Sequence, residues 1–315
     1  MSMTDETLSP VAVVGAGALG CLFGAMLARA GIPVTLIGRA SHVAAIRRDG
    51  LRFESRGQMT IIPVAATEDI AAVRGARLVL FCVKSTDTDE AARALAPHLG
   101  RDAVLVNLQN GVDNAERIRA HIGNRVLPGL VYVAAEMAGP GHVRHTGGGS
   151  LTIGELEVFR RDGPDRRLLE AIAALFTAAG IKVTISDAVE VDLWTKLVMN
   201  CAYNAISALT GSQYARMVAL PDIRAVMADT VNEVVAVAAA KGVRLPDDLV
   251  ARAIRLADGM PVTISSTAQD LLRGRRTEID HLNGYVAREG AALGIATPVN
   301  RTLNALVKLA EQKGL

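Results

Sequence analysis

The strongest constraint on the fold is an apolar segment near the start of the chain that runs directly into closely spaced glycines. Residues 11–20 read VAVVGAGALG, a strand-like run followed by G-x-G-x-x-G and an apolar helical stretch. Such glycines permit a tight turn, a close approach of backbone to a pyrophosphate, and close packing of helix on strand. The segment therefore predicts a dinucleotide-binding βαβ unit, in which the contacts come from Gly15, Ala16, Gly17, Ala18, Leu19 and Gly20.

Short apolar runs alternate with helical stretches through the first half of the chain, a pattern that builds a parallel sheet covered on both faces. Strands are predicted at 11–14, 34–37, 78–83, 104–108 and 126–133, with helices at 19–30 and 89–99. A glycine-rich stretch, 139–149, leads into 151–154, where we expect an antiparallel addition. A helix at 164–179 and a strand at 182–185 complete a Rossmann-type α/β domain.

Strand signals stop near Ala188, and amphipathic helical windows fill the rest of the chain. These windows cover 188–208, 222–240, 246–257, 265–272, 278–293 and 300–312. Gly242 is typical of a helix end and Pro246 of a first helical turn. The pattern predicts an α/β domain over residues 1–187 and an all-α domain over residues 188–315.

The end of the second predicted strand indicates which dinucleotide is bound. Proteins that bind NAD place a carboxylate there for the ribose 2′-hydroxyl, whereas this strand ends Leu36-Ile37-Gly38-Arg39, with no acid before Asp49. An arginine pairs well with a 2′-phosphate, so we predict NADP(H) rather than NAD(H). The competing interpretation is a solvated loop cation.

Two further strands end in residues suited to chemistry. The strand at 78–83 leads to Lys84, and the strand at 104–108 leads to Gln109-Asn110-Gly111. Both lie at the carboxyl edge, where open parallel sheets bind ligands. Lys84 suits a phosphate, and Asn110 suits the nicotinamide end and a substrate oxygen, although Asn-Gly is also a common turn pair.

The second half carries a polar row on an otherwise apolar helix. Lys196, Asn200 and Asn204 recur at four-residue spacing, so they follow one another along a single face. A partly buried ammonium needs a partner, and the amides have donors and acceptors to satisfy, which favours a small oxygen-rich ligand. The alternative is a lysine that extends to water beside asparagines that bind backbone.

Composition excludes several classes of protein. A net charge of +2 and 3% aromatic residues give no broad basic surface and few stacking platforms, so we expect no nucleic acid partner. Cys21, Cys82 and Cys201 lack the spacing of a zinc site or a disulfide framework, so we expect no metal and a reducing, cytoplasmic compartment. The acidic start is unlike a signal peptide, and acids interrupt 226–240, so we expect no membrane segment.

With these residues in view, the chain resembles the ketopantoate reductase (2-dehydropantoate 2-reductase) family over nearly its whole length. Beyond the glycine turn, Arg39, Lys84, Gln109-Asn110-Gly111 and the row from Lys196 to Asn204, the shared segments are specific to that family. They are Gly141-His142-Val143-Arg144-His145-Thr146-Gly147, Ile153-Gly154, Trp194-Thr195, Ser265-Ser266, Gln269-Asp270, Arg276-Thr277-Glu278-Ile279-Asp280, Asn283-Gly284 and Gly294-Ile295 before Pro298.

The resemblance implies that NADPH reduces a 2-oxo acid to a 2-hydroxy acid, most often 2-dehydropantoate to pantoate in pantothenate biosynthesis, between the two domains. It implies catalytic roles for Lys196, Asn110 and Glu278, with Lys196 as proton donor to the carbonyl oxygen. Asn110 and Glu278 also belong to the cofactor side, together with Arg39 and Lys84. Asn200, Asn204 and Ser266 are implied to hold the substrate, although Ser266 and Glu278 also have the positions of helix-start residues.

Departures from the family pattern bear on the substrate. Thr263 and Thr267 replace an asparagine and a methionine that are frequent in pantoate enzymes, and the run 131–137, VYVAAEM, lacks the usual threonine or histidine. Another 2-oxo or β-hydroxy acid is therefore an alternative substrate. A non-catalytic NADPH sensor is a rival function, although it would have no use for Lys196. The apolar helical faces suit a homodimer and a monomer's core equally well.

Overall fold

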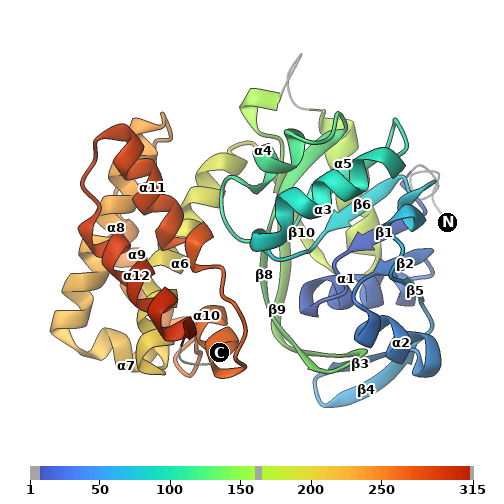
Figure 1. The fold of residues 1–315 in the computed structure, drawn as a ribbon, viewed down its shortest axis with the longest axis horizontal. Coiled ribbons are helices and arrows are strands. Elements are labelled where there is room, and N and C mark those ends of the chain that lie inside the picture. The colour runs from blue at the N-terminus through green and yellow to red at the C-terminus, as the bar shows by residue number, and fades with distance from the viewer. Residues whose placement is uncertain (1–7, 160–164, 313–315) are drawn as a thin grey trace. The chain divides into compact units, whose positions relative to one another are not determined.

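The structure, a computed structural model, describes residues 8–159 and 165–312. These residues form two compact units (Figure 1). Unit 1 contains the residues up to Gln109 and Asp113–Val189, and unit 2 contains Asn110–Val112 and the residues from Glu190 onward. The predicted fold class, an α/β sheet domain followed by a helical region, is confirmed.

Unit 1 is built on a ten-stranded sheet with the order β4-β3-β9-β8-β7-β6-β1-β2-β5, in which β10 also pairs with β9. The run from β8 to β5 is joined by parallel pairings only. Its carboxyl ends therefore share one edge. The strands are β1 Val11–Val14, β2 Val34–Ile37, β3 Leu51–Ser55, β4 Gln58–Ile62, β5 Ala65–Thr67, β6 Leu78–Phe81, β7 Val104–Asn107, β8 Arg125–Gly139, β9 His142–Gly154 and β10 Lys182–Ser186.

Helices cover this sheet because its central strands are apolar on both sides. Every residue of β1, β6 and β7 is buried. Helix α1 packs against β2, β8 and β9, and α5 packs against β10. Phe23 of α1 meets Phe176 of α5 edge to face at 5.9 Å between ring centroids. The helices of unit 1 are α1 Ala18–Arg29, α2 Ala40–Asp49, α3 Thr88–Leu95, α4 Asn114–Arg119 and α5 Arg166–Ala178.

The antiparallel addition to the sheet is longer than the sequence indicated. The glycine-rich stretch that we expected to precede it is largely strand, since β8 continues to Gly139 and β9 begins at His142. Three register shifts interrupt the β8–β9 ladder, and Gly148 adopts a φ of +70° beside them. Glycines at bulges of this kind do not prevent pairing, which is why composition alone misled. The predicted helix start at Pro164 lies outside the described residues.

Unit 2 is entirely helical within its described part. Its core surrounds α6, whose Trp194, Leu197, Val198 and Cys201 are buried. The helices are α6 Val189–Thr210, α7 Tyr214–Ala219, α8 Pro221–Ala240, α9 Leu249–Gly259, α10 Ser266–Leu272, α11 Asn283–Leu293 and α12 Pro298–Gln312. None of the described helices is both long enough and apolar enough to cross a membrane.

Two predicted helix starts in unit 2 are wrong. Helix α9 begins at Leu249 rather than at Pro246, after Asp248, whose carboxylate pairs with Arg252 one turn later at 2.7 Å. The window from Glu278 to Leu293 is not one helix. A short 3-10 helix, η5 Ile279–His281, comes first, and Leu282 (φ −114°, ψ −104°) then leaves helical geometry before α11.

Candidate active site

The turn between β1 and α1 is closed around two of its glycines and open at the third. Gly15 has a φ of +107°, and a Cβ atom there would lie 2.6 Å from the carbonyl carbon of Cys82. A Cβ atom on Gly20 would lie 2.1 Å from the oxygen of Gly15, whereas one on Gly17 would meet nothing within 4 Å. Packing thus requires two glycines, and the third leaves the space that a pyrophosphate needs.

The start of α1 suits an anion. Its N-cap is Gly17, which supplies no side-chain cap, and its first turn carries no acid. The amides of this turn are therefore not occupied by a capping side chain, and the helix dipole favours negative charge beside them. These features fit the phosphates of a dinucleotide.

Arg39 follows the strand that holds the glycine turn in place. The Ile37 oxygen at the end of β2 accepts hydrogen bonds from the amides of Gly15 and Ala16, at 2.9 and 3.0 Å. Arg39 is exposed two residues later, as the N-cap of α2. Asp49, the next acid, ends that helix and binds Arg48 at 2.7 Å. The charged side chain that follows β2 is thus a cation, as the sequence has it.

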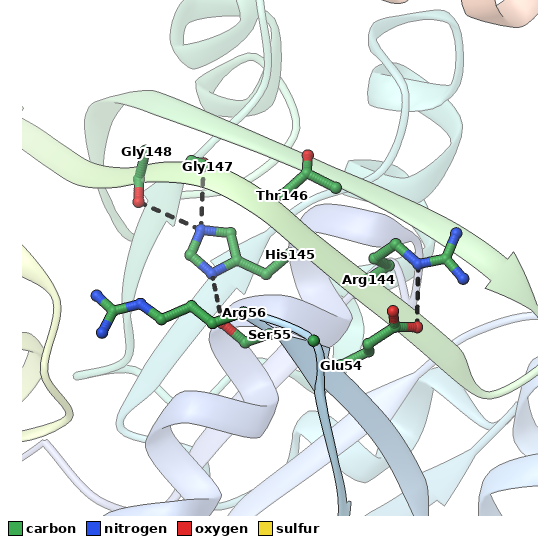
Figure 2. A pocket seen from close by; sticks show the side chains of 9 residues that line it. Glu54, Ser55, Arg56, Arg144, His145, Thr146, Gly147 and Gly148 are labelled. Carbon is green, nitrogen blue, oxygen red and sulfur yellow. Dashed lines mark hydrogen bonds and ion pairs between the residues drawn. The ribbon is translucent and has the colours of Figure 1, made fainter.

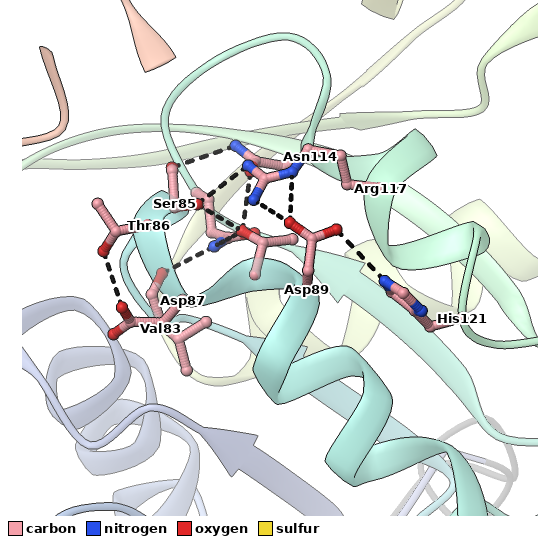
Figure 3. Close-up of polar contacts among 10 residues, drawn as sticks. Val83, Ser85, Thr86, Asp87, Asp89, Asn114, Arg117 and His121 are labelled. Atoms are coloured by element: carbon pink, nitrogen blue, oxygen red, sulfur yellow. Dashed lines mark hydrogen bonds and ion pairs between the residues drawn. The ribbon is translucent and has the colours of Figure 1, made fainter. Parts of the chain in front are cut away.

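The loops that follow β6 and β7 carry the next two predicted residues. Lys84 is half-buried and precedes a short 3-10 helix, η2 Ser85–Asp87. Asn110 is also half-buried, and its Nδ2 donates to Oε2 of Glu278 at 3.5 Å, a long contact within unit 2. Gln109, the residue before Asn110, belongs to a polar network in which the Thr88 hydroxyl binds Gln109 and Asn114, and Asn114 binds Arg117, as part of it is drawn in Figure 3.

Helix α6 places Lys196, Asn200 and Asn204 along one face, as the spacing predicts. Lys196 and Asn200 are half-buried, and Asn204 is buried. Burial lowers the pKa of Lys196 to about 8, and the negative charge of Glu278 opposes part of that shift. Unit 2 therefore brings Lys196, Glu278 and Asn110 into one electrostatic neighbourhood, with an amine that can gain or lose a proton near neutral pH.

Glu278 is not needed to cap the helical turn that follows it. The hydroxyl of Thr277 accepts from the amide of Ile279 at 3.2 Å and donates to Oε1 of Glu311 at 2.6 Å. The sequence predicts Thr277 as a cap and Glu278 as a first-turn acid, and it is the Thr277 hydroxyl that accepts the hydrogen bond here. The carboxylate of Glu278 instead accepts the hydrogen bond from Asn110, and its negative charge acts on Lys196.

The two adjacent serines have different environments. Ser265 is buried, and its hydroxyl caps α10 by accepting from the amide of Ala268 at 3.0 Å. The same hydroxyl donates to the backbone oxygen of Asn204 at 3.1 Å, which fixes α10 to α6. Ser266 is exposed and is not the cap that it resembled in sequence. The role of Ser265 escaped the sequence reasoning, although the Ser-Ser pair before a helical window was its signal.

His145 lies in β9 beside a cavity of about 420 Å³ that none of the predicted site residues lines (Figure 2). Its ring nitrogens lie 3.3 Å from the Ser55 hydroxyl and 3.1 Å from the Gly147 oxygen. Arg144, in the same wall, pairs with Glu54 and Glu136, each at 3.0 Å. These contacts hold the bulged strand together, and we assign the cavity no ligand.

Neither a disulfide nor a group of metal ligands is found among the described residues. All three cysteines are free. Burial raises the pKa of the Cys201 thiol, which lies on α6 like Lys196, so the thiol stays protonated. Within residues 8–159 and 165–312, no group of three His, Cys, Asp or Glu side chains could hold a metal ion. Lys196, by contrast, has a pKa that burial lowers to about 8, close to neutrality.

Comparison with known families gives a consistent result along the chain. Residues 11–157 match the family model described as "Ketopantoate reductase PanE/ApbA", and residues 188–311 match "Ketopantoate reductase PanE/ApbA C terminal". A 2-dehydropantoate 2-reductase of Halobacterium salinarum is 37% identical over 307 residues, which cover 96% of this chain and 99% of that protein.

Solved structures show the same relation and also a second activity. A PanE/ApbA family ketopantoate reductase from Ralstonia eutropha JMP134 is 51% identical with a TM-score of 0.89, covering 96% of this chain and 99% of that one. D-mandelate dehydrogenase in complex with NADH and anilino(oxo)acetate is 26% identical with a TM-score of 0.90 over the same shares. The similarity thus extends to proteins with different substrates.

Proposed function

The chain belongs to the ketopantoate reductase family, and from this premise we propose that it is an NADPH-dependent reductase of a 2-oxo acid. 2-Dehydropantoate is the substrate that we favour, because relatives 30–37% identical over nearly the whole chain carry that name. The observation that carries the proposal is Lys196, an amine with a pKa of about 8 under the influence of Glu278, on the helix face that bears Asn200 and Asn204.

We assign residues 1–187 to NADP(H) binding and residues 188–315 to binding of the oxo acid. The glycine turn and the start of α1 would hold the pyrophosphate, Arg39 the 2′-phosphate, and Lys84 a further part of the cofactor. The bound cofactor would supply a hydride. In unit 2, Asn200, Asn204 and Ser266 would hold the carboxylate and hydroxyl of the substrate.

The chemistry assigned to Lys196 follows from charge. Hydride addition to C2 leaves negative charge on the carbonyl oxygen, and an ammonium beside that oxygen stabilises the charge before and during transfer. Lys196 would then give a proton from Nζ to the oxygen, which yields the 2-hydroxy acid and a neutral amine that solvent reprotonates. Asn110 would add a hydrogen bond to the same oxygen, and Glu278 would orient the ammonium.

A second candidate is a reductase for another 2-oxo acid. D-mandelate dehydrogenase, whose fold is similar, was solved with NADH and anilino(oxo)acetate, so the fold accommodates an aryl-substituted oxo acid in that protein. Thr263 and Thr267 also depart from the pattern of pantoate enzymes in this chain. A change of one hydrogen bond in a pocket alters discrimination by orders of magnitude, so these positions bear directly on substrate choice.

One assay tests the proposal and its rivals. NADPH absorbance is followed with 2-dehydropantoate, phenylglyoxylate and smaller 2-oxo acids, for wild type and Lys196→Ala. We expect wild type to prefer 2-dehydropantoate, and Lys196→Ala to lose roughly 10²-fold or more in kcat while it binds NADPH normally, as for loss of a general acid. Preference for another acid would reject the pantoate assignment, and NADPH binding without turnover of any acid would indicate a sensor.

A further inference from the structure

The side chain of Gln109 extends the pairing of two strands beyond the point where their backbones separate. The last backbone link from β7 to β6 runs from the Leu108 amide to the Phe81 oxygen at 3.0 Å. One residue later, Nε2 of Gln109 donates to the Val83 oxygen at 3.0 Å. A side-chain amide thus forms the next rung, between the residue before Lys84 and the residue before Asn110.

The local sequence explains why this side chain turns inward. The Oδ1 atom of Asn107 accepts a hydrogen bond from the backbone amide of Gln109 at 3.2 Å, which is the two-residue spacing of an Asx turn. Both residues are buried, with 3% and 5% of their surfaces exposed. A side chain that leaves a strand through such a turn, without access to water, has to find its partners within the protein.

The other hydrogen of the Gln109 amide is also committed. Nε2 donates to the Thr88 hydroxyl at 2.8 Å, and that hydroxyl lies 3.0 Å from Oδ1 of Asn114 and 3.1 Å from the Ser85 oxygen. Arg117 reaches the Ser85 oxygen at 3.0 Å and is held in turn by Asp89 (Figure 3). Gln109 is therefore the end of a buried network that anchors the start of α3 and both loops.

The orientation of the amide follows from chemistry. The Val83 oxygen can only accept a hydrogen bond, so the nitrogen of Gln109 has to face it. The Oε1 atom is buried and accepts no hydrogen bond from the described residues. Replacement of the amide by an acceptor would therefore set oxygen against oxygen at the rung.

We propose that Gln109 is a positioning residue for the reaction, which sets the loops that carry Lys84 and Asn110 through its bonds to Val83 and Thr88. The inference rests on the proposed function, because Lys84 and Asn110 have a common task only if a cofactor and an oxo acid are bound. Misplacement of reacting groups by about 1 Å can reduce a rate about 10²-fold, so a buried rung of this kind influences catalysis without contact with substrate.

The test uses Gln109→Met, which keeps the size of the side chain and removes both donors. The matched control is Asn124→Leu, since Nδ2 of Asn124 donates to the Gly100 and Ala103 oxygens, at 2.8 and 2.9 Å, at the opposite end of β7. We expect kcat/KM to fall about 10-fold or more in Gln109→Met and to stay near the wild-type value in Asn124→Leu, even where both lower the melting temperature equally. The primary isotope effect with deuterated NADPH should rise only in Gln109→Met.

Hydrogen exchange by mass spectrometry provides a readout that is independent of activity. Peptides that cover residues 82–88 and 108–112 should exchange faster in Gln109→Met and at the wild-type rate in Asn124→Leu. Unchanged exchange in these peptides, or kinetic constants equal to those of Asn124→Leu, would overturn the inference. Wild-type protein that reduces no 2-oxo acid would instead reject the proposed function, while the exchange comparison would still decide whether Gln109 holds the loops.

A second pair of variants covers the case in which Gln109→Met fails to fold. Thr88→Val removes the hydroxyl that Gln109 binds, and Thr88→Ser retains it. We expect faster exchange at residues 82–88 and 108–112 and a lower kcat/KM in Thr88→Val, with recovery of both in Thr88→Ser. Equal behaviour of the two variants would contradict the role of the rung.

Discussion

A single amine, Lys196, decides whether the proposed site can deliver a proton at physiological pH. Burial disfavours its ammonium form and the carboxylate of Glu278 favours it, and together they lower the pKa to about 8. The amine is then mostly protonated at neutral pH but gives up its proton far more easily than an exposed lysine. A general acid works best under this condition.

The pH dependence of the reaction follows from this pKa. Only the protonated amine can donate, so kcat/KM for reduction should be level below about pH 8 and then fall about tenfold for each pH unit above it. The reverse oxidation, which needs the neutral amine, should rise over the same range. Initial rates between pH 6 and pH 10 measure both limbs. A reduction rate that stays level up to pH 10 would show that Lys196 is not the acid.

Arg39 determines the expected choice of cofactor. Replacement by Asp removes the cation for the 2′-phosphate and introduces a charge that repels it, so the affinity for NADPH should fall by about 10-fold to 100-fold while that for NADH is maintained or improves. Binding titrations with both cofactors measure the change. Arg48→Ala, at the other end of α2 and paired with Asp49, is the control that should alter neither affinity. An equal loss of affinity for NADPH and NADH would show that Arg39 does not bind the 2′-phosphate.

At the scale of elements, the β1–α1 turn allows packing and ligand binding to be tested separately. Gly20→Ala would press a methyl group against the Gly15 oxygen and should lower the melting temperature, whereas Gly17→Ala meets open space and should fold normally. The same methyl group on Gly17 would occupy the approach of the pyrophosphate, so this variant should lose NADPH affinity without losing stability. Thermal unfolding and cofactor titration of both variants measure the two effects. Normal NADPH binding by Gly17→Ala would contradict the assignment of the β1–α1 turn to the pyrophosphate.

Element types were predictable where a period or a glycine pattern dictated them. The buried strands β1 and β6 are continuous apolar runs and β7 is apolar up to Asn107, and α6 shows the spacing of its polar row directly. Helix starts were less predictable, because Asp248 and Leu282 act through local pairing and backbone angles that residue type does not encode. The β8–β9 addition was underestimated, since the glycines of a bulged strand resemble those of a loop.

The elements that carry the candidate site residues were predictable in the same way, while the roles of these residues stay predictions. Lys196, Arg39 and Asn110 follow sequence features with a physical reason, namely a helical row and two strand ends. Gln109, Thr88 and Asn114 were not assigned roles, because a network joins residues distant in sequence and no spacing marks it. Buried polar residues at the end of an apolar strand are the signal that can identify such networks.

For the whole molecule, the assignment of the cofactor to unit 1 and of the oxo acid to unit 2 can be tested by ligand-dependent stability. A ligand present at 100 times its Kd stabilises the state that binds it by about 2.7 kcal/mol. NADPH should therefore raise the melting temperature of wild type and of Lys196→Ala by the same amount, because Lys196 belongs to unit 2 and not to the cofactor turn. Wild type should gain a further increase from a non-reducible 2-oxo acid analogue such as oxamate. Its carboxylate can pair with the ammonium of Lys196 and the side-chain amides of Asn200 and Asn204. Lys196→Ala should lose most of this second increase.

Scanning calorimetry with each ligand alone and with both together measures the two effects, and Asn124→Leu, which alters unit 1 away from the turn, should retain both increases. An oxamate response of equal size in Lys196→Ala and wild type would remove the oxo acid from α6, and loss of the NADPH response in Lys196→Ala would contradict the separate assignment of the two ligands.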